Sequence, residues 1–517
     1  MASPPMSKPL TRLLLLTVLA PSAGLHSVQP ILRATRASDS RMTAPLTQER
    51  GGAPTVPLSS SVINLSKNII CGGFLSLPAG IAACAQFPTA ATLLPAGGLL
   101  AFMGLLSAYC FSLIGRACAL TREPSYAGAW TRSIGMRSGP LIKASLTLKT
   151  GATCLSYSMI LADMAAQLTG VPRPTALAGV TATVLLPLCL LDTSKTFGLL
   201  RYSSAAGLAA TAFVTCFMGL RYFTGGYATA PVAGPFLAGV PLSFHPHFGG
   251  SALGTTALPL FGGLTSGLFV LLSILATAFM AHYNAPAFLR DAAGLRLVRE
   301  PVNSDRGGDH SAGSQMEERL TTPTDAGIAR FNKVVALSFA SSAATFFAVA
   351  AFGFLTFGAG AAGNVLSNYA RSDPLALGAR FALGISLVAG YPLAFAGLQK
   401  AAYEAIGRVV GPGVSPKAVS LLLLGLITSA ATVLTDLGFV SAFAGALLGS
   451  AIIYVYPSIM FRGAVRCAMV NTSMDSKRQA RLKFESAASV AITLAGIALM
   501  ALGGGTTIQA RLARGGA

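Results

Sequence analysis

The sequence predicts an all-α polytopic membrane protein with about eleven transmembrane helices. Apolar residues make up 53% of the 517 residues and charged residues only 10%, whereas a soluble domain carries roughly 25% charged residues. The mean hydropathy of +0.64 reflects long apolar runs separated by short polar stretches. Each run approaches the ~20 residues that a helix needs to cross the hydrocarbon core, so most of the chain is expected to lie in a bilayer.

Windows of about 19 residues locate eleven candidate spans. Glycine recurs in the spans from residue 93 onward, for example at Gly97, Gly104, Gly445 and Gly449. Because small residues let helix backbones approach closely in lipid, we expect tight contacts between these helices. The spans lie at roughly 62–87, 93–118, 141–167, 174–192, 201–223, 264–289, 331–357, 375–399, 415–434, 437–461 and 486–503.

The distribution of Lys and Arg predicts which way the helices run. Loops that follow even-numbered spans hold many of these residues, whereas loops on the other face hold few. Since such a bias marks the cytoplasmic face, we expect the N-terminus in the cytoplasm and the C-terminus on the opposite side. The formal net charge of +20 is therefore a topology signal. Without a soluble basic domain it does not indicate a nucleic-acid partner.

Two polar regions flank or interrupt the predicted transmembrane domain, residues 58–505. Within residues 1–57, the apolar run LLLLTVLA follows Lys8 and Arg12 and precedes a Ser- and Arg-bearing stretch. This is the order of a signal segment followed by a transit segment, which would direct the chain to a plastid membrane. The alternative is a disordered cytoplasmic tail on a plasma-membrane or endomembrane protein. Residues 291–330 are expected to form a polar cytoplasmic loop between spans six and seven.

Two of the spans are interrupted by residues that break helices. In span one, the run VINLSKNIICGGFLSLP has Gly72 and Gly73 in its middle, and in span six polar residues come directly before Pro286. An interrupted helix is tolerated in a membrane only where its freed N–H and C=O groups face a cavity or a ligand. Breaks in spans one and six are typical of a five-plus-five inverted repeat with a midplane binding site. A carboxylate-bearing substrate fits, since half-helix N–H groups attract an anion.

Three ionisable residues within the spans are candidates for ion coupling, namely Lys149, Asp163 and His282. A charge in the hydrocarbon core costs several kcal/mol, so each such residue is a functional candidate by default. Lys149 and Asp163 are separated by nearly four helical turns and lie on similar faces of span three. The alternatives are that these two snorkel from the helix ends and that His282 only hydrogen-bonds a carbonyl freed near Pro286.

Four segments of the sequence carry the motifs on which a family resemblance rests. They are NLSKNIICGGFLSLP from Asn64, LSYSMILAD from Leu155, PLCLLDTSKTFGLLRYSS from Pro187 and FMAHYNAP from Phe279. These segments resemble the amino acid/auxin permease family, which includes the sodium-coupled neutral amino-acid transporters. The similar features cover most of residues 58–461.

The resemblance implies a leucine-transporter-like fold and secondary active transport of amino acids, expected to be neutral ones, by alternating access. A sodium or proton gradient would drive transport, and no other cofactor or metal is implied. Gly72 and Gly73 would offer backbone N–H groups to the substrate carboxylate, and Tyr157 would face the site from span three. The expected substrate-binding residues are Asn64, Cys71, Gly72, Gly73, Ser76, Tyr157, Thr277, Phe279, His282 and Ser386.

Two features depart from the family pattern. Cys71 stands where the family usually has the first glycine of a Gly-x-Gly motif. The segment LVAGY before Pro392 lacks the hydroxyls that sodium-coupled relatives tend to supply, and Ser386 is the nearest substitute. Coupling to sodium and coupling to protons therefore both stay open.

One other function fits the same scaffold, that of a non-transporting amino-acid sensor. Such a protein would be expected to carry a signalling tail, whereas the N-terminal segment has the composition of a targeting address. An enzyme is not expected, because the spans contain no nucleophile–base set and no metal-ligand cluster. The expected partners are a small amino-acid substrate and the lipid bilayer.

The charge distribution leads to a testable prediction about topology. A tag inserted near Gly307 is expected to be accessible from the cytoplasmic side, or from the stroma in a plastid, and a tag after Gly516 is not. Labelling of sealed vesicles with an impermeant reagent measures this. Two tags on the same side would contradict an odd number of spans.

Overall fold

The computed structural model describes the chain in nine segments, which fall within one compact unit, Pro54–Ala517. The segments are 56–70, 72–84, 88–190, 203–229, 232–248, 265–301, 316–410, 413–471 and 475–515. The predicted N-terminal targeting segment lies outside them as far as residue 55. Cys71 and residues 302–315 of the polar loop also lie outside the described residues.

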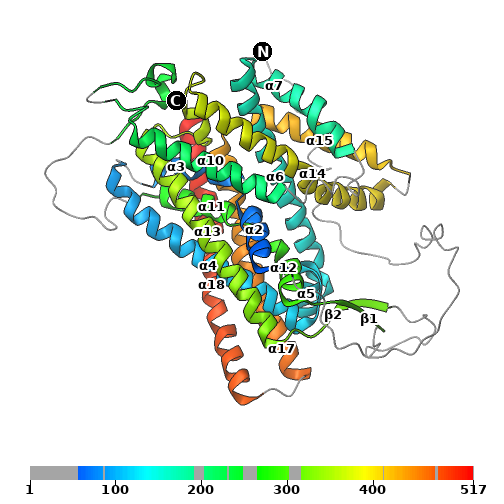
Figure 1. The fold of residues 1–517 in the computed structure, drawn as a ribbon. Coiled ribbons are helices and arrows are strands. Elements are labelled where there is room, and N and C mark those ends of the chain that lie inside the picture. Colours follow the sequence, from blue (N-terminus) through cyan, green and yellow to red (C-terminus); the bar gives the residue numbers. More distant parts are fainter. Residues whose placement is uncertain are drawn as a thin grey trace, which may run out of the picture. The chain divides into compact units, whose positions relative to one another are not determined.

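The described part is almost entirely helical (Figure 1). Within it, nine helices are long and apolar enough to cross a membrane, or ten when the bent pair Leu58–Ile69 and Gly72–Ala83 counts as one span. The remaining predicted span is α6, which has 31 residues but is more polar because it carries Lys143, Lys149 and Asp163. The all-α, multi-pass fold predicted from the sequence is confirmed.

In chain order the helices and strands are α2 (Leu58–Ile69), α3 (Leu77–Ala83), α4 (Leu93–Thr121), α5 (Tyr126–Ile134), α6 (Gly139–Thr169), α7 (Arg173–Val180), α8 (Leu186–Leu190), α10 (Ser203–Phe223), α11 (Gly267–Ala278), α12 (Ala285–Ala293), β1 (Leu297–Pro301), β2 (Met316–Leu320), α13 (Asp325–Phe357), α14 (Pro374–Val410), α15 (Pro416–Val433), α16 (Leu437–Ala444), α17 (Tyr456–Asn471) and α18 (Ser476–Gly515).

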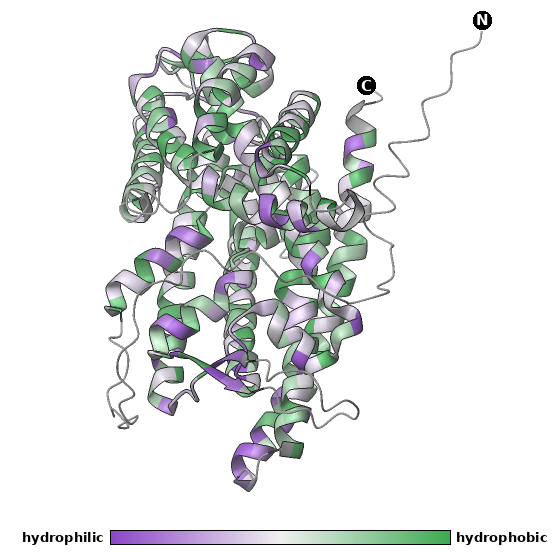
Figure 2. Ribbon diagram, turned by 90° about the vertical axis from the view of Figure 1, so that its right-hand side faces the viewer, coloured by the Kyte–Doolittle hydropathy of each residue, from purple (hydrophilic) through white to green (hydrophobic). Residues whose placement is uncertain are grey.

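The hydropathy of the chain agrees with a membrane setting. Hydrophobic residues dominate the helices, and hydrophilic residues gather on β1, β2 and the lower end of α18 (Figure 2). Large apolar side chains such as Leu105, Phe223 and Val433 are 74–76% exposed. Extended apolar surfaces are rare on soluble monomers, so these side chains are expected to face lipid.

The break of span one lies between α2 and the helical segment Gly72–Ala83, where the chain bends by 51°. This segment begins with a 3-10 turn over Gly72–Ser76 and continues as α3. A Cβ at Gly72 would lie 2.6 Å from Cδ1 of Ile160, and one at Gly73 would lie 3.1 Å from Cγ2 of Thr277. The two glycines therefore let the break pass close to α6 and α11.

Span six breaks where α11 ends. A 3-10 turn over His282–Asn284 follows, and α12 has Pro286 in its first turn, a position where a helix has no use for the missing N–H. The side-chain amide of Asn284 donates to Oδ1 of Asn68 on α2 at 3.0 Å. Both predicted breaks are present, and this hydrogen bond joins the two broken spans directly.

Span ten crosses α11 at a position where the backbones nearly touch. Between α16 and α17 the chain forms two π-helical stretches, Gly445–Gly449 and Ala451–Val455. A Cβ at Gly445 would lie 1.7 Å from the carbonyl oxygen of Ser273 on α11. Only glycine permits this crossing, as the small-residue pattern of the sequence predicts.

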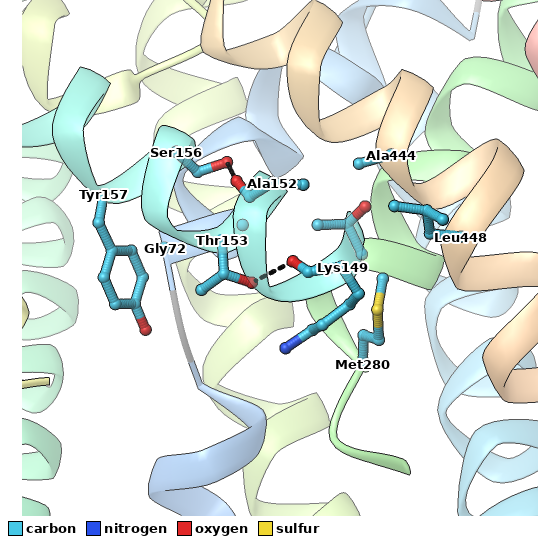
Figure 3. A pocket seen from close by; sticks show the side chains of 11 residues that line it. Gly72, Lys149, Ala152, Thr153, Ser156, Tyr157, Met280, Ala444 and Leu448 are labelled. Atoms are coloured by element: carbon cyan, nitrogen blue, oxygen red, sulfur yellow. Dashed lines mark hydrogen bonds between the residues drawn. The ribbon is translucent and has the colours of Figure 1, made fainter. Parts of the chain in front are cut away.

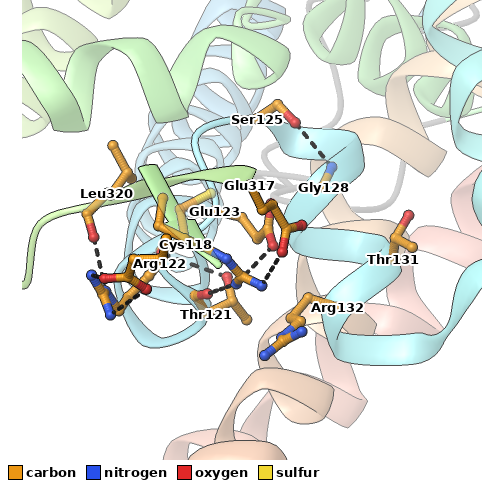
Figure 4. A network of polar contacts seen from close by, with 12 residues as sticks. Cys118, Thr121, Arg122, Glu123, Ser125, Gly128, Thr131, Arg132, Glu317 and Leu320 are labelled. Carbon is orange, nitrogen blue, oxygen red and sulfur yellow. Dashed lines mark hydrogen bonds and ion pairs between the residues drawn. The ribbon is translucent and has the colours of Figure 1, made fainter. Parts of the chain in front are cut away.

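The polar loop between spans six and seven contains structure that the sequence pattern did not predict. Strands β1 and β2 form an antiparallel hairpin that is held against the turn between α4 and α5 (Figure 4). The Arg122 guanidinium donates to the Leu320 carbonyl at 2.9 Å, and Arg319 forms an ion pair with Glu123 at 3.0 Å. These contacts fix both strands to the helix bundle.

The α11 crossing yields a prediction about stability. Gly445→Ala is expected to lower the melting temperature of the purified protein in detergent, because a methyl group must displace the Ser273 carbonyl, and overpacking costs about 1–3 kcal/mol. The matched control is Gly425→Ala on α15, where a Cβ meets nothing within 4 Å. An equal melting temperature for both variants would show that span ten does not depend on this crossing.

Candidate functional site

The break of span one borders a cavity lined by four parts of the chain (Figure 3). Its volume is about 30 Å³, and because a water needs roughly 10–15 Å³, it has room for about two water molecules. The lining residues come from the span-one break, from α6, from the end of α11 and from the part of span ten where α16 ends. They are Gly72, Gly73, Lys149, Ala152, Thr153, Ser156, Tyr157, Thr277, Met280, Ala444 and Leu448.

Helix α6 supplies the polar wall of the cavity. Lys149, Thr153 and Tyr157 recur every four residues, so helical geometry places them along one face, and Figure 3 shows them leaving α6 on the cavity side. The Thr153 hydroxyl donates to the Lys149 carbonyl and the Ser156 hydroxyl to the Ala152 carbonyl, both at 3.0 Å. With their protons engaged, these hydroxyls offer acceptor lone pairs to the cavity.

Lys149 is the cation of the cavity. Its side chain is only 6% exposed, and its Nζ lies 4.1 Å from the centre of the Tyr283 ring. An aromatic face attracts an ammonium group electrostatically, so Tyr283 stabilises the charge there. None of the lining residues carries a carboxylate, and the lining as a whole bears one positive charge.

The broken helix and α11 form the opposite wall. Gly72 and Gly73 begin a helical segment whose first N–H groups have no partner within the helix. The Thr277 hydroxyl donates to the carbonyl of Ser441 on α16 at 2.6 Å, which fixes α11 beside span ten. The backbone donors on one wall and the ammonium group on the other can each bind an anionic group such as a carboxylate.

The structure brings five of the predicted residues together at this cavity. They are Gly72, Gly73, Lys149, Tyr157 and Thr277. A Cβ at Gly72 would lie 3.7 Å from the ring of Tyr157, so the break and the tyrosine are in contact. The cavity therefore lies where the first break was expected to place a binding site.

Five other predicted substrate-binding residues do not line the cavity in the described part of the chain. Asn64 is exposed on α2, and Ser76 donates its hydroxyl to the Gly363 carbonyl at 2.7 Å. Phe279 is completely buried among phenylalanine rings of α13, because the chain leaves helical geometry after α11 and turns this side chain away. The other two are His282 and Ser386, and the predicted Cys71 lies outside the described residues.

His282 is buried away from the cavity. Its Nε2 donates to the Ser107 carbonyl of α4 at 2.9 Å, and the rings of Phe111 and Phe339 lie 5.5 and 6.0 Å from its ring. It does not line the cavity, because the turn after α11 directs it toward α4 and α13, and its role in substrate binding stays a prediction. Its contacts match the structural alternative, a hydrogen bond to a carbonyl, although that carbonyl belongs to a neighbouring helix.

Ser386 lies at a contact between α14 and α2. The Nζ of Lys67 on α2 donates to the Ser386 hydroxyl at 3.0 Å. Sodium-coupled relatives tend to supply hydroxyls in this part of span eight, and Ser386 is the nearest substitute in this chain. In this structure the Ser386 hydroxyl accepts a hydrogen bond from the Lys67 ammonium group. Lys67 was missed as a candidate, although a lysine within a span is itself the signal that could have found it.

Asp163 is paired at the far end of α6. Its carboxylate accepts from Arg173 at 2.6 Å and from the Asn364 amide at 3.1 Å. Arg173 begins α7, so the ion pair closes the corner between α6 and α7. Asp163 does not reach the cavity, and its contacts are those of a residue that holds helix ends together.

Residues 314–509 match a family model described as transmembrane amino acid transporter protein. Over these residues the match agrees with the predicted family. The match covers predicted spans seven to eleven, and together with the apolar helices it identifies a multi-pass membrane transporter. A search among curated proteins finds no match to the chain.

Two solved transporter structures are similar to the chain over much of its length. The Eremococcus coleocola manganese transporter, in complex with an aromatic bis-isothiourea substituted compound, has a TM-score of 0.45 and 11% identity and covers 89% of this chain and 98% of its own. Mhp1, a nucleobase-cation-symport-1 family transporter in a closed conformation with bromovinylhydantoin bound, has a TM-score of 0.43 and 12% identity, covering 89% and 96%.

Several lining residues of this transporter were missed by reasoning from the sequence. Helical periodicity from Lys149 could have found those on α6, because they share its face. Met280 follows the end of α11 and could have been found from its place in the break. Ala444 ends α16 and Leu448 lies in the π-helical stretch that follows it, for which the sequence gives no signal. The missed residues are Ala152, Thr153, Ser156, Met280, Ala444 and Leu448.

Proposed function

We propose that the chain is a secondary active transporter that moves amino acids across a membrane by alternating access. The observation that carries this proposal is the meeting of the span-one break and a buried cation at one cavity. Secondary transporters bind their substrates at such breaks near the midplane. The family match of residues 314–509 supports amino acids as the substrate class.

The two halves of broken span one suit the two charges of an amino acid. The N–H groups that begin at Gly72 and Gly73 attract the substrate carboxylate, because the start of a helix carries partial positive charge. The last carbonyls of α2 carry partial negative charge and attract the α-ammonium group. A zwitterion can therefore bind across the break with both charged groups facing complementary ends.

The small volume of the cavity supports a binding site whose walls separate when the substrate enters. A volume of about 30 Å³ holds about two waters, whereas an amino acid needs several times more. The walls are in contact, since a Cβ at Gly72 would already overlap Ile160 of α6. Substrate entry must therefore separate the broken helix from α6, and separation toward one face and then the other is alternating access.

Lys67 favours protons over sodium as the coupling ion. Its ammonium group donates to Ser386 between α2 and α14, and a sodium ion at that hydroxyl would meet a like charge at close range. Under this proposal Lys67 binds and releases the coupling proton, and loss of the ammonium would weaken the contact of broken span one with span eight. Proton binding at Lys67 would thus be linked to the position of the substrate-binding helix.

The carboxylate site is tested by Gly73→Val. The larger side chain is expected to reduce amino-acid uptake into proteoliposomes at least about tenfold, because it fills the space that the anion needs and displaces a charge-assisted hydrogen bond of ~1.5–3 kcal/mol. Gly98→Val on α4 is the control, since a Cβ there meets nothing within 4 Å. Normal amino-acid uptake by the Gly73→Val protein would show that the break of span one is not part of the substrate site.

The coupling ion is tested by imposing one gradient at a time on the same proteoliposomes. An inward proton gradient is expected to drive accumulation and a sodium gradient is not. Lys67→Met is expected to abolish accumulation but to retain exchange of labelled for unlabelled substrate, whereas Lys333→Met, an exposed lysine on α13, keeps both. Sodium-driven accumulation without a response to pH contradicts the proposed role of Lys67.

A further inference from the structure

The cavity carries a positive charge that no neighbouring side chain neutralises in the described part of the chain. The buried acids pair with arginines elsewhere, as in Asp163 with Arg173 and Asp373 with Arg221. The contact made by the Lys149 ammonium is with the ring of Tyr283. A buried ion is costly unless an opposite charge and hydrogen bonds compensate it, so the cavity lacks a counter-ion.

The net charge of the substrate decides whether the free-energy cost of burying the Lys149 ammonium is compensated. A neutral amino acid is a zwitterion, adds no net charge and leaves the occupied cavity at +1. A cationic amino acid raises the sum to +2, whereas an amino acid with a second carboxylate brings it to zero. We propose that the cavity selects acidic amino acids and that Lys149 pairs with the side-chain carboxylate. This inference rests on the proposed transport function and replaces the expectation of neutral substrates.

The backbone N–H groups at the break and the Lys149 ammonium are placed so that an acidic amino acid can contact both. Gly72 contacts α6 at the level of Tyr157, and Lys149 lies eight residues before Tyr157, about 12 Å along the helix axis. The long Lys149 side chain projects into the space that separates them (Figure 3). A substrate whose α-carboxylate lies at the break can therefore extend its side chain along α6 toward the ammonium group.

The intervening surface favours an extended side chain with a charged tip. Thr153 lies one turn from Lys149 and presents a hydroxyl oxygen whose proton is already donated to the helix. Met280 and Leu448 lie on the other walls, where a flexible thioether and an apolar side chain can pack against methylene groups. Specificity for the charge thus depends on Lys149 alone among the lining residues.

Wild-type protein in proteoliposomes provides the first test. Uptake of labelled L-glutamate is compared with L-glutamine, and L-aspartate with L-asparagine, because each pair has nearly the same shape and differs by one charge. The acidic member is expected to be preferred at least about tenfold in kcat/KM, which corresponds to about 1.4 kcal/mol. Equal uptake, or preference for the amides, overturns the inference whatever the variants do.

Variants of Lys149 then assign the preference to its charge. Lys149→Met is expected to lose the preference for glutamate while still transporting glutamine, and Lys149→Arg, which keeps the charge, is expected to retain it. The matched control is Lys143→Met, an exposed lysine on the same helix, which leaves the preference unchanged. A Lys149→Met protein that still prefers glutamate, or that loses only glutamine uptake, overturns the assignment.

The outcomes separate this inference from the proposed function on which it rests. Transport of neutral amino acids without glutamate or aspartate refutes the selectivity and leaves amino-acid transport standing. Failure of the wild-type protein to take up or exchange any amino acid refutes both. Loss of pH-driven accumulation for every substrate in Lys149→Met, with the preference for glutamate intact in exchange, would make Lys149 a coupling group and overturn its role in recognition.

Discussion

The need to satisfy backbone polar groups in hydrocarbon is the constraint on which this structure depends. Most of the chain meets it with continuous helices, which pair their own N–H and C=O groups. The helices of spans one and six are interrupted, and at the first interruption the freed groups meet a cavity lined by α6. The hydrogen bond between Asn68 and Asn284 ties the two interruptions together, so the part of the membrane domain with the least helical pairing forms one connected region.

Close packing around the breaks requires residues without side chains. Gly72 and Gly73 face α6 and α11, and Gly445 lies against the carbonyl of Ser273. Lipid tails are as apolar as leucine, so helix association in a membrane depends on such close contact more than on burial of apolar surface. The same glycines that let helices touch also leave little space between them. The cavity is small for that reason, and a substrate can enter only if the walls separate.

Charged groups inside the bundle are each stabilised in a different way. Asp163 is paired with Arg173 at a helix corner, Lys67 donates to a hydroxyl of the neighbouring span, and Lys149 lies against an aromatic ring. The pairing of Asp163 is complete within the protein, which suits a structural role. The two lysines have neutral protein partners in these contacts, and the proposals above assign Lys67 to the coupling proton and Lys149 to an anionic group of the substrate.

The sequence by itself determined the membrane fold and the position of both breaks, because apolar runs, Gly72 with Gly73 and Pro286 act through local geometry. It also marked Lys149 as a functional candidate, since a charge within a span is costly. The tertiary structure alone decided which side chains meet across helices. It directed His282 toward α4, brought Lys67 to Ser386, folded a hairpin in the polar loop and carried Leu448 to the cavity through a π-helical stretch. These outcomes depend on how non-helical turns rotate and on which distant segments pack together, and neither is encoded in local spacing.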